Sequence, residues 1–309
     1  MLFRALSFPP ELVSYMAFEP IAIPPFLNIE QAKAKDYLDH IAQTDLLTGI
    51  PVETEAVVGD IAPAILTAID EHHSDLVVMS SHGYTGLKRW VMGSIAEKMV
   101  RLSPVPILMQ RDEGPDLATV LPSEGSLQAL IPLDGSRRAE DAIVPAGQLV
   151  AALSTPGQGS LHLLRVVVTP THDLIGYSAG EAILQTAKEY IQATLKRLLS
   201  GQLASSLSDL GLSLSGSVTI DGDIAAGIAR VAESGESAGG NFVEATDTVQ
   251  PSQLIAMATH GYGGLQLLTM GSVTGRTLLA TRLPLLIVRP PDMKRKMTDV
   301  AATPTGAKR

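Results

Sequence analysis

Short apolar runs alternate along the C-terminal half of the chain with segments whose apolar residues recur at helical spacing. A run of the first kind predicts a buried strand, and a segment of the second kind predicts an amphipathic helix. The predicted strands cover residues 128–133, 161–168, 214–220, 253–258 and 284–289. The predicted helices cover residues 138–153, 180–206, 224–234 and 272–281. Strands that alternate with helices in this way predict a parallel sheet with helices on both faces.

One predicted helix carries its apolar side chains on a single face, which includes Ile183, Ala187, Tyr190 and Leu195. These residues are three or four positions apart, so they are neighbours on a helix surface. We interpret this face as packing against the core rather than as a surface for a partner helix.

The chain contains an internal repeat. Residues 75–111 align without a gap with residues 253–289, and the matched positions include glycine, histidine, serine and arginine. Further upstream, Gly59-Asp60-Ile61-Ala62 matches Gly222-Asp223-Ile224-Ala225. The sequence therefore consists of two copies of one α/β unit. The second copy has a longer polar segment around residues 234–251, which we interpret as a surface loop.

The first copy lacks the beginning that the second copy has. In the second copy, a strand at 128–133 and a helix at 138–153 precede the first element that both copies share. Their counterparts would lie before residue 1. We therefore predict two doubly wound parallel five-stranded sheets, of which the first lacks its first strand and helix. Two hypotheses follow: the natural reading frame begins upstream, or this copy is degenerate and binds no ligand.

The length of 309 residues is typical of two domains. We predict an N-terminally incomplete first domain at 1–112, a linker at 113–126, a second domain at 127–291 and a flexible tail at 292–309. The linker and the tail are polar and contain proline, which favours irregular structure.

Composition excludes several kinds of site and partner. The chain has no cysteine, which excludes disulfide bonds, thiolate metal sites and a cysteine nucleophile. Its net charge of −9 argues against a nonspecific nucleic-acid binder, because binding phosphates needs clustered cations. No apolar run approaches the ~18 residues of a membrane-spanning helix. We therefore expect a cytoplasmic protein without nucleic-acid or membrane partners.

The strongest candidate for a binding site is a Gly-Ser pair at the start of a predicted helix. Gly271-Ser272 has this position. Gly261 follows a predicted strand, and nine residues separate it from the pair. The first copy repeats the pattern as Gly83 and Gly93-Ser94. Such a pair offers backbone N–H groups, a hydroxyl and the positive end of the helix dipole, which suit a phosphate. The alternative is a plain tight turn with a serine cap, and retention of the pattern in both copies favours phosphate binding.

These residues resemble the nucleotide motif of the universal stress protein family, which reads Gly, two residues, Gly, nine residues, Gly and then Ser or Thr. The second copy reads Ala258-Thr259-His260-Gly261, nine residues, Gly271-Ser272. The first copy reads Ser80-Ser81-His82-Gly83, nine residues, Gly93-Ser94. Both copies depart from the motif at its first glycine, which is replaced by Ala258 or Ser80. The small side chain at this position leaves a ligand less room to approach the backbone. The resemblance covers nearly the whole chain as a tandem pair and implies the sheet order 3-2-1-4-5.

The resemblance implies that the second copy binds ATP, with Mg²⁺ as a possible companion. Pro132-Leu133-Asp134 matches the family's Pro-x-Asp, and Asp134 would accept hydrogen bonds from the nucleoside. Val166 matches the valine whose backbone holds the adenine. The implied nucleotide-binding residues are Pro132, Leu133, Asp134, Val166, Met257, Ala258, His260, Gly261, Gly271, Ser272, Val273 and Thr274. The corresponding residues of a degenerate site in the first copy are Gly83, Gly93, Ser94 and Ile95.

Three arginines, Arg137, Arg138 and Arg276, are candidate phosphate ligands, but for each of them we favour a solvated charge at a helix end. The two histidines that precede the motif glycines are interpreted as simple contacts or caps. No metal site is expected, because His72 and His73 lack the spacing and partners of metal ligands.

We expect an ATP-binding stress-response regulatory protein with little or no turnover, because no general base or nucleophile is identified. The P-loop motif is absent. Two other functions stay open: a nucleotide-free interaction module of the same family, favoured by Ala258, and an enzyme of the wider adenine-nucleotide alpha-hydrolase-like group. The resemblance also implies pairing through the last strand, either between residues 106–110 and 284–289 as a pseudo-dimer within one chain, or in a homodimer.

Overall fold

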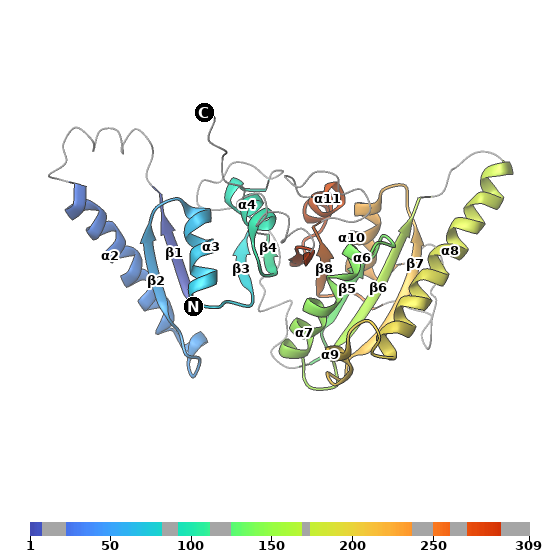
Figure 1. The fold of residues 1–309 in the computed structure, drawn as a ribbon, viewed down its shortest axis with the longest axis horizontal. Helices are drawn as coiled ribbons and strands as arrows, with labels where there is room; N and C mark the ends of the chain where they lie inside the picture. The colour runs from blue at the N-terminus through green and yellow to red at the C-terminus, as the bar shows by residue number, and fades with distance from the viewer. Residues whose placement is uncertain are drawn as a thin grey trace, which may run out of the picture. The chain divides into compact units, whose positions relative to one another are not determined.

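The computed structural model describes residues 1–7, 23–81, 92–111, 125–168, 174–236, 250–259 and 271–291 (Figure 1). The chain divides into two compact units, Met1–Asp75 and Leu76–Arg309. The division falls inside the first copy of the repeat, so the units and the copies do not coincide. The predicted domain boundaries at 112 and 127 stay predictions. The predicted tail, most of the predicted linker and most of the loop at 234–251 lie outside the described residues.

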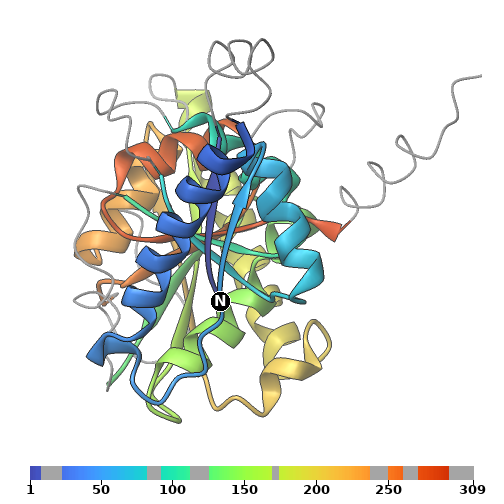
Figure 2. The same ribbon diagram turned by 90° about the vertical axis from the view of Figure 1, so that its left-hand side faces the viewer.

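The first unit has a two-stranded parallel sheet made of β1 (Leu2–Leu6) and β2 (Thr54–Val58). Its helices are α2 (Ile23–Ala42), the short 3-10 helix η1 (Asp45–Leu47) and α3 (Ile61–Glu71). Figure 2 shows α2, in dark blue, beside the two strands. This helix buries Ala34 and Leu38, and its Gln31 side chain donates a hydrogen bond to the Ala56 carbonyl of β2 (2.6 Å).

The second unit has a seven-stranded sheet in the order β3-β4-β9-β8-β5-β6-β7. Its strands are β3 (Val77–Ser80), β4 (Ile107–Gln110), β5 (Gln128–Pro132), β6 (Ser160–Val167), β7 (Ser213–Ile220), β8 (Leu254–Ala258) and β9 (Leu285–Val288). The second copy contributes β5 to β9, all parallel, in the order 3-2-1-4-5 when counted along this copy. The prediction of an α/β fold with largely parallel sheets is confirmed.

The first copy contributes β3 and β4 to this same sheet. These two strands are parallel to each other, and β4 pairs antiparallel with β9. The last strands of the two copies therefore pair within the chain, as the resemblance implied. In the second copy β5 joins β6 to β8, whereas the described part of the first copy has no strand that joins β1 to β3. Consequently β1 and β2 form a sheet of their own.

The helices of the second unit are α4 (Ser94–Leu102), α6 (Arg137–Glu140), α7 (Ile143–Leu153), α8 (Leu174–Leu199), α9 (Ser205–Ser208), α10 (Ile224–Ser234) and α11 (Ser272–Ala280). The single helix predicted at 138–153 is instead α6 and α7. Pro145 has no N–H, and its ring would clash with the Asp141 carbonyl in a continuous helix. The helix predicted at 180–206 is instead α8 and α9, because Gly201 (φ 70°) takes the left-handed conformation that ends a helix.

Helices cover both faces of the second copy's part of the sheet. α7 and α8 pack on the face where Leu161, Leu163 and Ile191 are fully buried, and α10 and α11 cover the other face. α8 lies close to β7 because residue 216 is glycine, where a Cβ would be 2.6 Å from Ile191 Cγ2. Ala187 and Leu195 of α8 are buried in this core, as predicted. In the parts of the chain that the structure describes, no helix has the length and apolar composition of a membrane span.

Candidate functional site

A cavity of about 1000 Å³ opens at the carboxyl ends of β5, β6 and β8. Ligands of doubly wound sheets bind at this edge, and ~300–1000 Å³ is the usual size of a small-molecule pocket. The residues at or just after the strand ends are Pro132, Leu133, Asp134, Gly135, Arg165, Val166, Val167, Val168, Met257, Ala258 and Thr259. The residues from helices are Ala139, Ala182, Ile183, Thr186, Ala187, Tyr190, Ile224 and Ile228, together with Gly271, Ser272, Val273 and Thr274.

Ten of the twelve residues that the resemblance implied for the second copy line this one cavity, although they come from four separate stretches of the chain. The other two, His260 and Gly261, lie outside the described residues. The structure therefore brings together the strand-end aspartate, the valine of β6 and the start of α11. Whether these residues bind a nucleotide is a separate question from their proximity.

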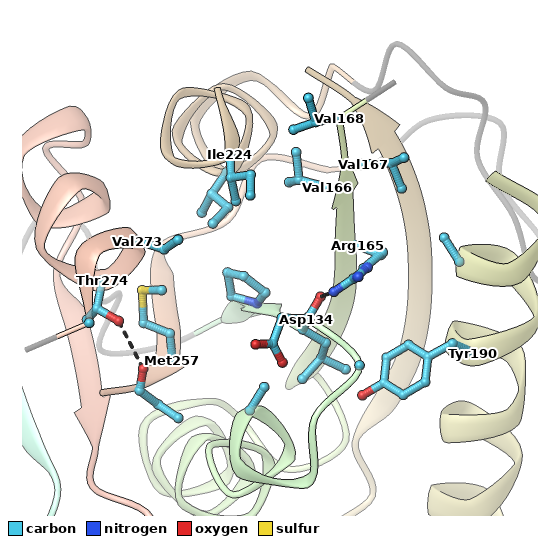
Figure 3. Close-up of a pocket in the computed structure, with 18 of the residues that line it drawn as sticks. Asp134, Arg165, Val166, Val167, Val168, Tyr190, Ile224, Met257, Val273 and Thr274 are labelled. Atoms are coloured by element: carbon cyan, nitrogen blue, oxygen red, sulfur yellow. Dashed lines mark hydrogen bonds between the residues drawn. The ribbon is translucent and has the colours of Figure 1, made fainter. Parts of the chain in front are cut away.

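Asp134 is held in place by the start of α6. Its Oδ1 atom accepts hydrogen bonds from the Ser136 N–H (2.9 Å) and the Ser136 hydroxyl (2.6 Å). Ser136 is the N-cap of α6 and accepts a hydrogen bond from the Ala139 N–H (3.2 Å). Figure 3 shows the carboxylate of Asp134 in the cavity, between Met257 on one side and Arg165 on the other. The turn after β5 thus presents a carboxylate whose position is fixed.

Val166 forms an apolar wall together with Ile224 and Ile228 of α10. Val166 is 8% exposed at the end of β6. α10 approaches this strand closely because residue 227 is glycine. A Cβ at Gly227 would lie 3.1 Å from Val166 Cγ1 and 2.9 Å from Asp221 Cβ. The glycine therefore sets the width of the cavity at this wall.

The N-terminus of α11 forms a neighbouring wall and is tied to the end of β8. The Gly271 N–H donates to the Thr259 carbonyl (2.9 Å), and the Thr274 hydroxyl donates to the Ala258 carbonyl (3.0 Å; Figure 3). The first N–H groups of a helix have no partner within the helix, and the positive end of the helix dipole lies there. An anion in the cavity would therefore meet backbone donors that Gly271 and Ser272 leave accessible.

Arg165 and Tyr190 also line the cavity, and the sequence analysis did not assign them to the site. Arg165 Nη1 donates to the Leu133 carbonyl (3.1 Å; Figure 3). The Tyr190 hydroxyl donates to Glu140 Oε1 (3.0 Å), which also pairs with Arg197 (2.6 Å). Burial, together with the Glu140 carboxylate, raises the pKa of Tyr190 above its ordinary value. Tyr190 therefore contributes a neutral hydroxyl and a ring to the wall.

The sequence held a signal for one of these residues. Arg165 interrupts an apolar run at 161–168, and a charge inside a buried strand is unusual enough to mark a site. Tyr190 and Ile183 share the apolar stripe of α8 with true core residues, so helical spacing could not separate them. The interpretation of Ile183 as a core residue is wrong, because its side chain is 43% exposed at the cavity.

None of the three candidate phosphate arginines is among the residues that line the cavity. Arg276 points to α10 instead, where it pairs with Asp223. Arg137 and Arg138 lie in the short helix α6. In the described residues, no group of three or more metal-ligating side chains could hold a metal ion.

The corresponding helix start in the first copy has nearly the same backbone. The Gly93 N–H donates to the Ser81 carbonyl (3.0 Å), and Gly93 has φ −59° and ψ 145°, against −54° and 141° for Gly271. Ser94 and Ile95 begin α4 as Ser272 and Val273 begin α11. The first copy has Ala96 where the second has Thr274, so the hydroxyl that ties the helix to its strand is absent. Gly83 lies outside the described residues.

Comparison with known proteins finds relatives for part of the chain. Residues 7–111 match the model of the universal stress protein family. Universal stress protein MJ0531 of Methanocaldococcus jannaschii is 34% identical over 61 residues, which are 20% of this chain and 36% of that protein. Universal stress protein MJ0577 of the same organism is 30% identical over 77 residues, 25% of this chain and 48% of that protein. The matched residues thus span less than half of the length of these relatives.

Solved structures show the same fold at low identity. A universal stress protein from Archaeoglobus fulgidus has a TM-score of 0.54 and 18% identity, with 87% of this chain and 81% of that chain covered. A Pseudomonas aeruginosa protein has a TM-score of 0.57 and 14% identity, with 98% and 97% covered. Identities this low establish the fold and nothing finer. The family model over residues 7–111, the curated relatives and the fold agree: the chain is similar to universal stress proteins and has their fold.

Proposed function

We propose that the second copy binds an adenine nucleotide, ATP, and that the protein acts as a stress-response regulator rather than as an enzyme. The observation that carries this proposal is the convergence on one cavity of Asp134, Val166 and the start of α11. These are the residues to which the family resemblance assigns the nucleoside, the adenine and the phosphates. Asp134 and the start of α11 are more than 130 positions apart in the sequence, so the fold is what brings them together.

Each wall of the cavity suits one part of the nucleotide. The apolar surface of Val166, Ile224 and Ile228 would take the adenine ring, and the backbone at Val166 would meet its polar edge. The Asp134 carboxylate would accept hydrogen bonds from ribose hydroxyl groups. The phosphates would lie at the N-terminus of α11, where free N–H groups and the helix dipole favour an anion. A volume of about 1000 Å³ accommodates all three parts.

A magnesium ion that accompanies ATP would be held mainly by phosphate oxygens and water, which is usual for this ion. The described residues contain no cluster of three metal-ligating side chains that could hold it without the nucleotide. Among the lining residues, Asp134 is the one that carries a carboxylate. We therefore propose that metal binding depends on nucleotide binding.

Slow or absent turnover follows from the same set of side chains. General base catalysis needs an acceptor near the attacking water. Asp134 Oδ1 already accepts two hydrogen bonds from Ser136, and we place this residue at the ribose rather than at the phosphates. The lining residues near the start of α11 are Gly271, Ser272, Val273 and Thr274, and none of these is a base at neutral pH.

Calorimetric titration of the full chain with ATP and Mg²⁺ tests the proposal. We expect one site per chain and loss of binding in Asp134→Ala. The matched control is Asp209→Ala, which removes an exposed carboxylate at the end of α9 that does not line the cavity. Absence of saturable binding by a well-folded wild type would favour the alternative, a nucleotide-free interaction module. Ala258 is the feature that favours that alternative, since it stands in the cavity where the family motif has glycine.

A further inference from the structure

The pairing of β4 with β9 relates the two copies by an approximate twofold axis. In the antiparallel register, Leu108 lies opposite Leu286, and these two residues are counterparts in the repeat. Ile107 lies opposite Ile287, and Met109 lies opposite Leu285. All of these side chains are buried, with at most 4% of the surface exposed. The strand pair is therefore a packed junction at which each copy meets the other in an equivalent way.

An arginine follows each of the two strands and reaches the other copy. Arg111, after β4, donates from Nη1 to the carbonyls of Leu279 (3.0 Å) and Thr281 (2.9 Å). These carbonyls are at the C-terminal end of α11. Arg289, after β9, donates from Nη1 to the Leu102 carbonyl (3.3 Å), at the end of α4. Arg111 and Arg289 are counterparts in the repeat, so the contact is reciprocal.

The two contacts act on the ends of helices where carbonyl groups have no partner within the helix. A cation that donates to these carbonyls also interacts favourably with the negative end of the helix dipole. Arg111 is half-buried and reaches two carbonyls, so it fixes the C-terminal end of α11 in two directions. α11 has nine residues and behaves as one rigid rod about 13 Å long. Fixing one end of this helix therefore helps to fix its other end.

The other end of α11 is the wall of the cavity at which we place the phosphates. There the Thr274 hydroxyl and the Gly271 N–H tie the helix to β8. α11 is thus held at its N-terminus by the second copy and at its C-terminus by Arg111 of the first copy. The first copy, whose own site is incomplete, contributes to the geometry of the site in the second.

We propose that Arg111 is a positioning residue for the nucleotide site: through α11 it sets the position of the Gly271–Thr274 wall and therefore the affinity for ATP. The effect on ATP affinity rests on the proposed function. The effect of Arg111 on the position of α11 does not. Docking of β4 on β9 would then regulate nucleotide affinity, because any change that withdraws Arg111 loosens the phosphate wall. Binding is reciprocal, so the nucleotide would in turn strengthen the junction.

The experiment compares Arg111→Met with its repeat counterpart Arg289→Met in the full chain, and includes Arg111→Lys as the conservative variant. The first readout is hydrogen exchange without nucleotide, at amides whose partners are known. These are Gly271 and Gly275 at the start of α11, and Gly93 and Glu97 at the start of α4. We expect Arg111→Met to speed exchange at the first pair and Arg289→Met to speed exchange at the second pair. Arg111→Lys should restore part of the protection.

The second readout is the ATP dissociation constant, measured well below the melting temperature. We expect Arg111→Met to weaken binding at least about fivefold and Arg289→Met to change it less than about twofold. Unchanged exchange at Gly271 and Gly275 in Arg111→Met would overturn the inference, whether or not the protein binds ATP. Equal weakening of ATP binding by both variants would also overturn it, because a general loss of stability would then explain the result. A wild type that binds no ATP, with the crossed exchange pattern intact, would contradict the proposed function and leave the mechanical link in place.

Discussion

The two copies share the start of a helix but not the surroundings of that start. Gly93-Ser94 and Gly271-Ser272 have the same backbone conformation within a few degrees, and both glycine N–H groups bind the residue that follows the preceding strand. Only the second start faces a carboxylate and an apolar wall across a cavity, as far as the described residues show. The start of α11 therefore differs from that of α4 in the residues that neighbouring strands bring beside it.

The completing strand in the second copy is β5. It carries Asp134 past its end, and it lies between β6, which carries Val166, and β8, which leads to α11. The first copy retains the strands on either side of this position but has no described equivalent of β5. In the described residues, the difference between the surroundings of the two helix starts therefore lies in one element of secondary structure. The predictions below alter features that the copies do not share.

The largest expected effect comes from His162, a buried histidine of β6. Its ring nitrogens lie 2.8 Å from the hydroxyls of Ser215 and Ser217, and burial lowers its pKa to about 4. The unfolded chain binds a proton with a pKa of ~6.5, so stability is complete above that pH and falls as pH drops towards 4. We expect a loss of about 3 kcal/mol over this window.

Denaturant unfolding at several pH values between 4 and 7 measures this effect. His162→Gln serves as the comparison, because glutamine does not titrate and retains hydrogen-bonding groups for the two serines. The pH slope should be much smaller in this variant. An equal slope in both proteins would assign the acid sensitivity to other groups and contradict the prediction.

The next effect concerns the close contact of α10 with β6. Gly227 aligns with Ala64 of the first copy, so Gly227→Ala makes the second copy resemble the first at this point. The added Cβ would lie 2.9 Å from Asp221 Cβ and 3.1 Å from Val166 Cγ1, which forces α10 outward. We expect a loss of about 1–2 kcal/mol in stability, despite the higher helix propensity of alanine, and weaker ATP binding. Chemical denaturation and calorimetry provide both values, and a stabilised variant would show that the contact is loose.

A smaller effect is expected at Thr274, where the first copy has Ala96. Thr274→Ala removes the buried hydrogen bond to the Ala258 carbonyl (3.0 Å), and we expect a loss of about 1 kcal/mol in stability. ATP binding should weaken as the helix start loses its tie to β8. Ala96→Thr in the first copy is the reciprocal change and should leave the ATP affinity unaltered. If Thr274→Ala keeps full affinity, the tie does not position the phosphate wall.

The smallest effect is expected at Arg276. This side chain pairs with Asp223 at the surface, with 57% and 41% of the two side chains exposed, and such pairs contribute little to stability. Arg276→Ala should change the ATP dissociation constant less than about twofold and stability by less than about 0.5 kcal/mol. A strong loss of ATP affinity in Arg276→Ala would contradict this prediction and indicate that Arg276 binds the phosphates.

Hydrophobic periodicity and the repeat predicted the parallel α/β sheets and the positions of most strands of the second copy to within a residue or two. The errors have local causes. Pro145 and Gly201 interrupted helices whose apolar spacing continued past them. Tyr190 has the spacing of a core residue and packs against the core, but it also lines the cavity. The resemblance supplied Asp134 and Val166, whereas residue spacing alone could not show that strands from distant positions end at one cavity.

One measurement tests the central claim that the nucleotide site is in the second copy and requires its neighbours. Calorimetric titration with ATP and Mg²⁺ compares Gly271→Val with its counterpart Gly93→Val, each in the full chain. A valine side chain has the same chemistry at both helix starts, but residue 271 lines the cavity described above and residue 93 does not. The account predicts one site per chain, lost in Gly271→Val and retained with unchanged affinity in Gly93→Val. Two sites per chain, or loss of binding in Gly93→Val alone, would contradict it.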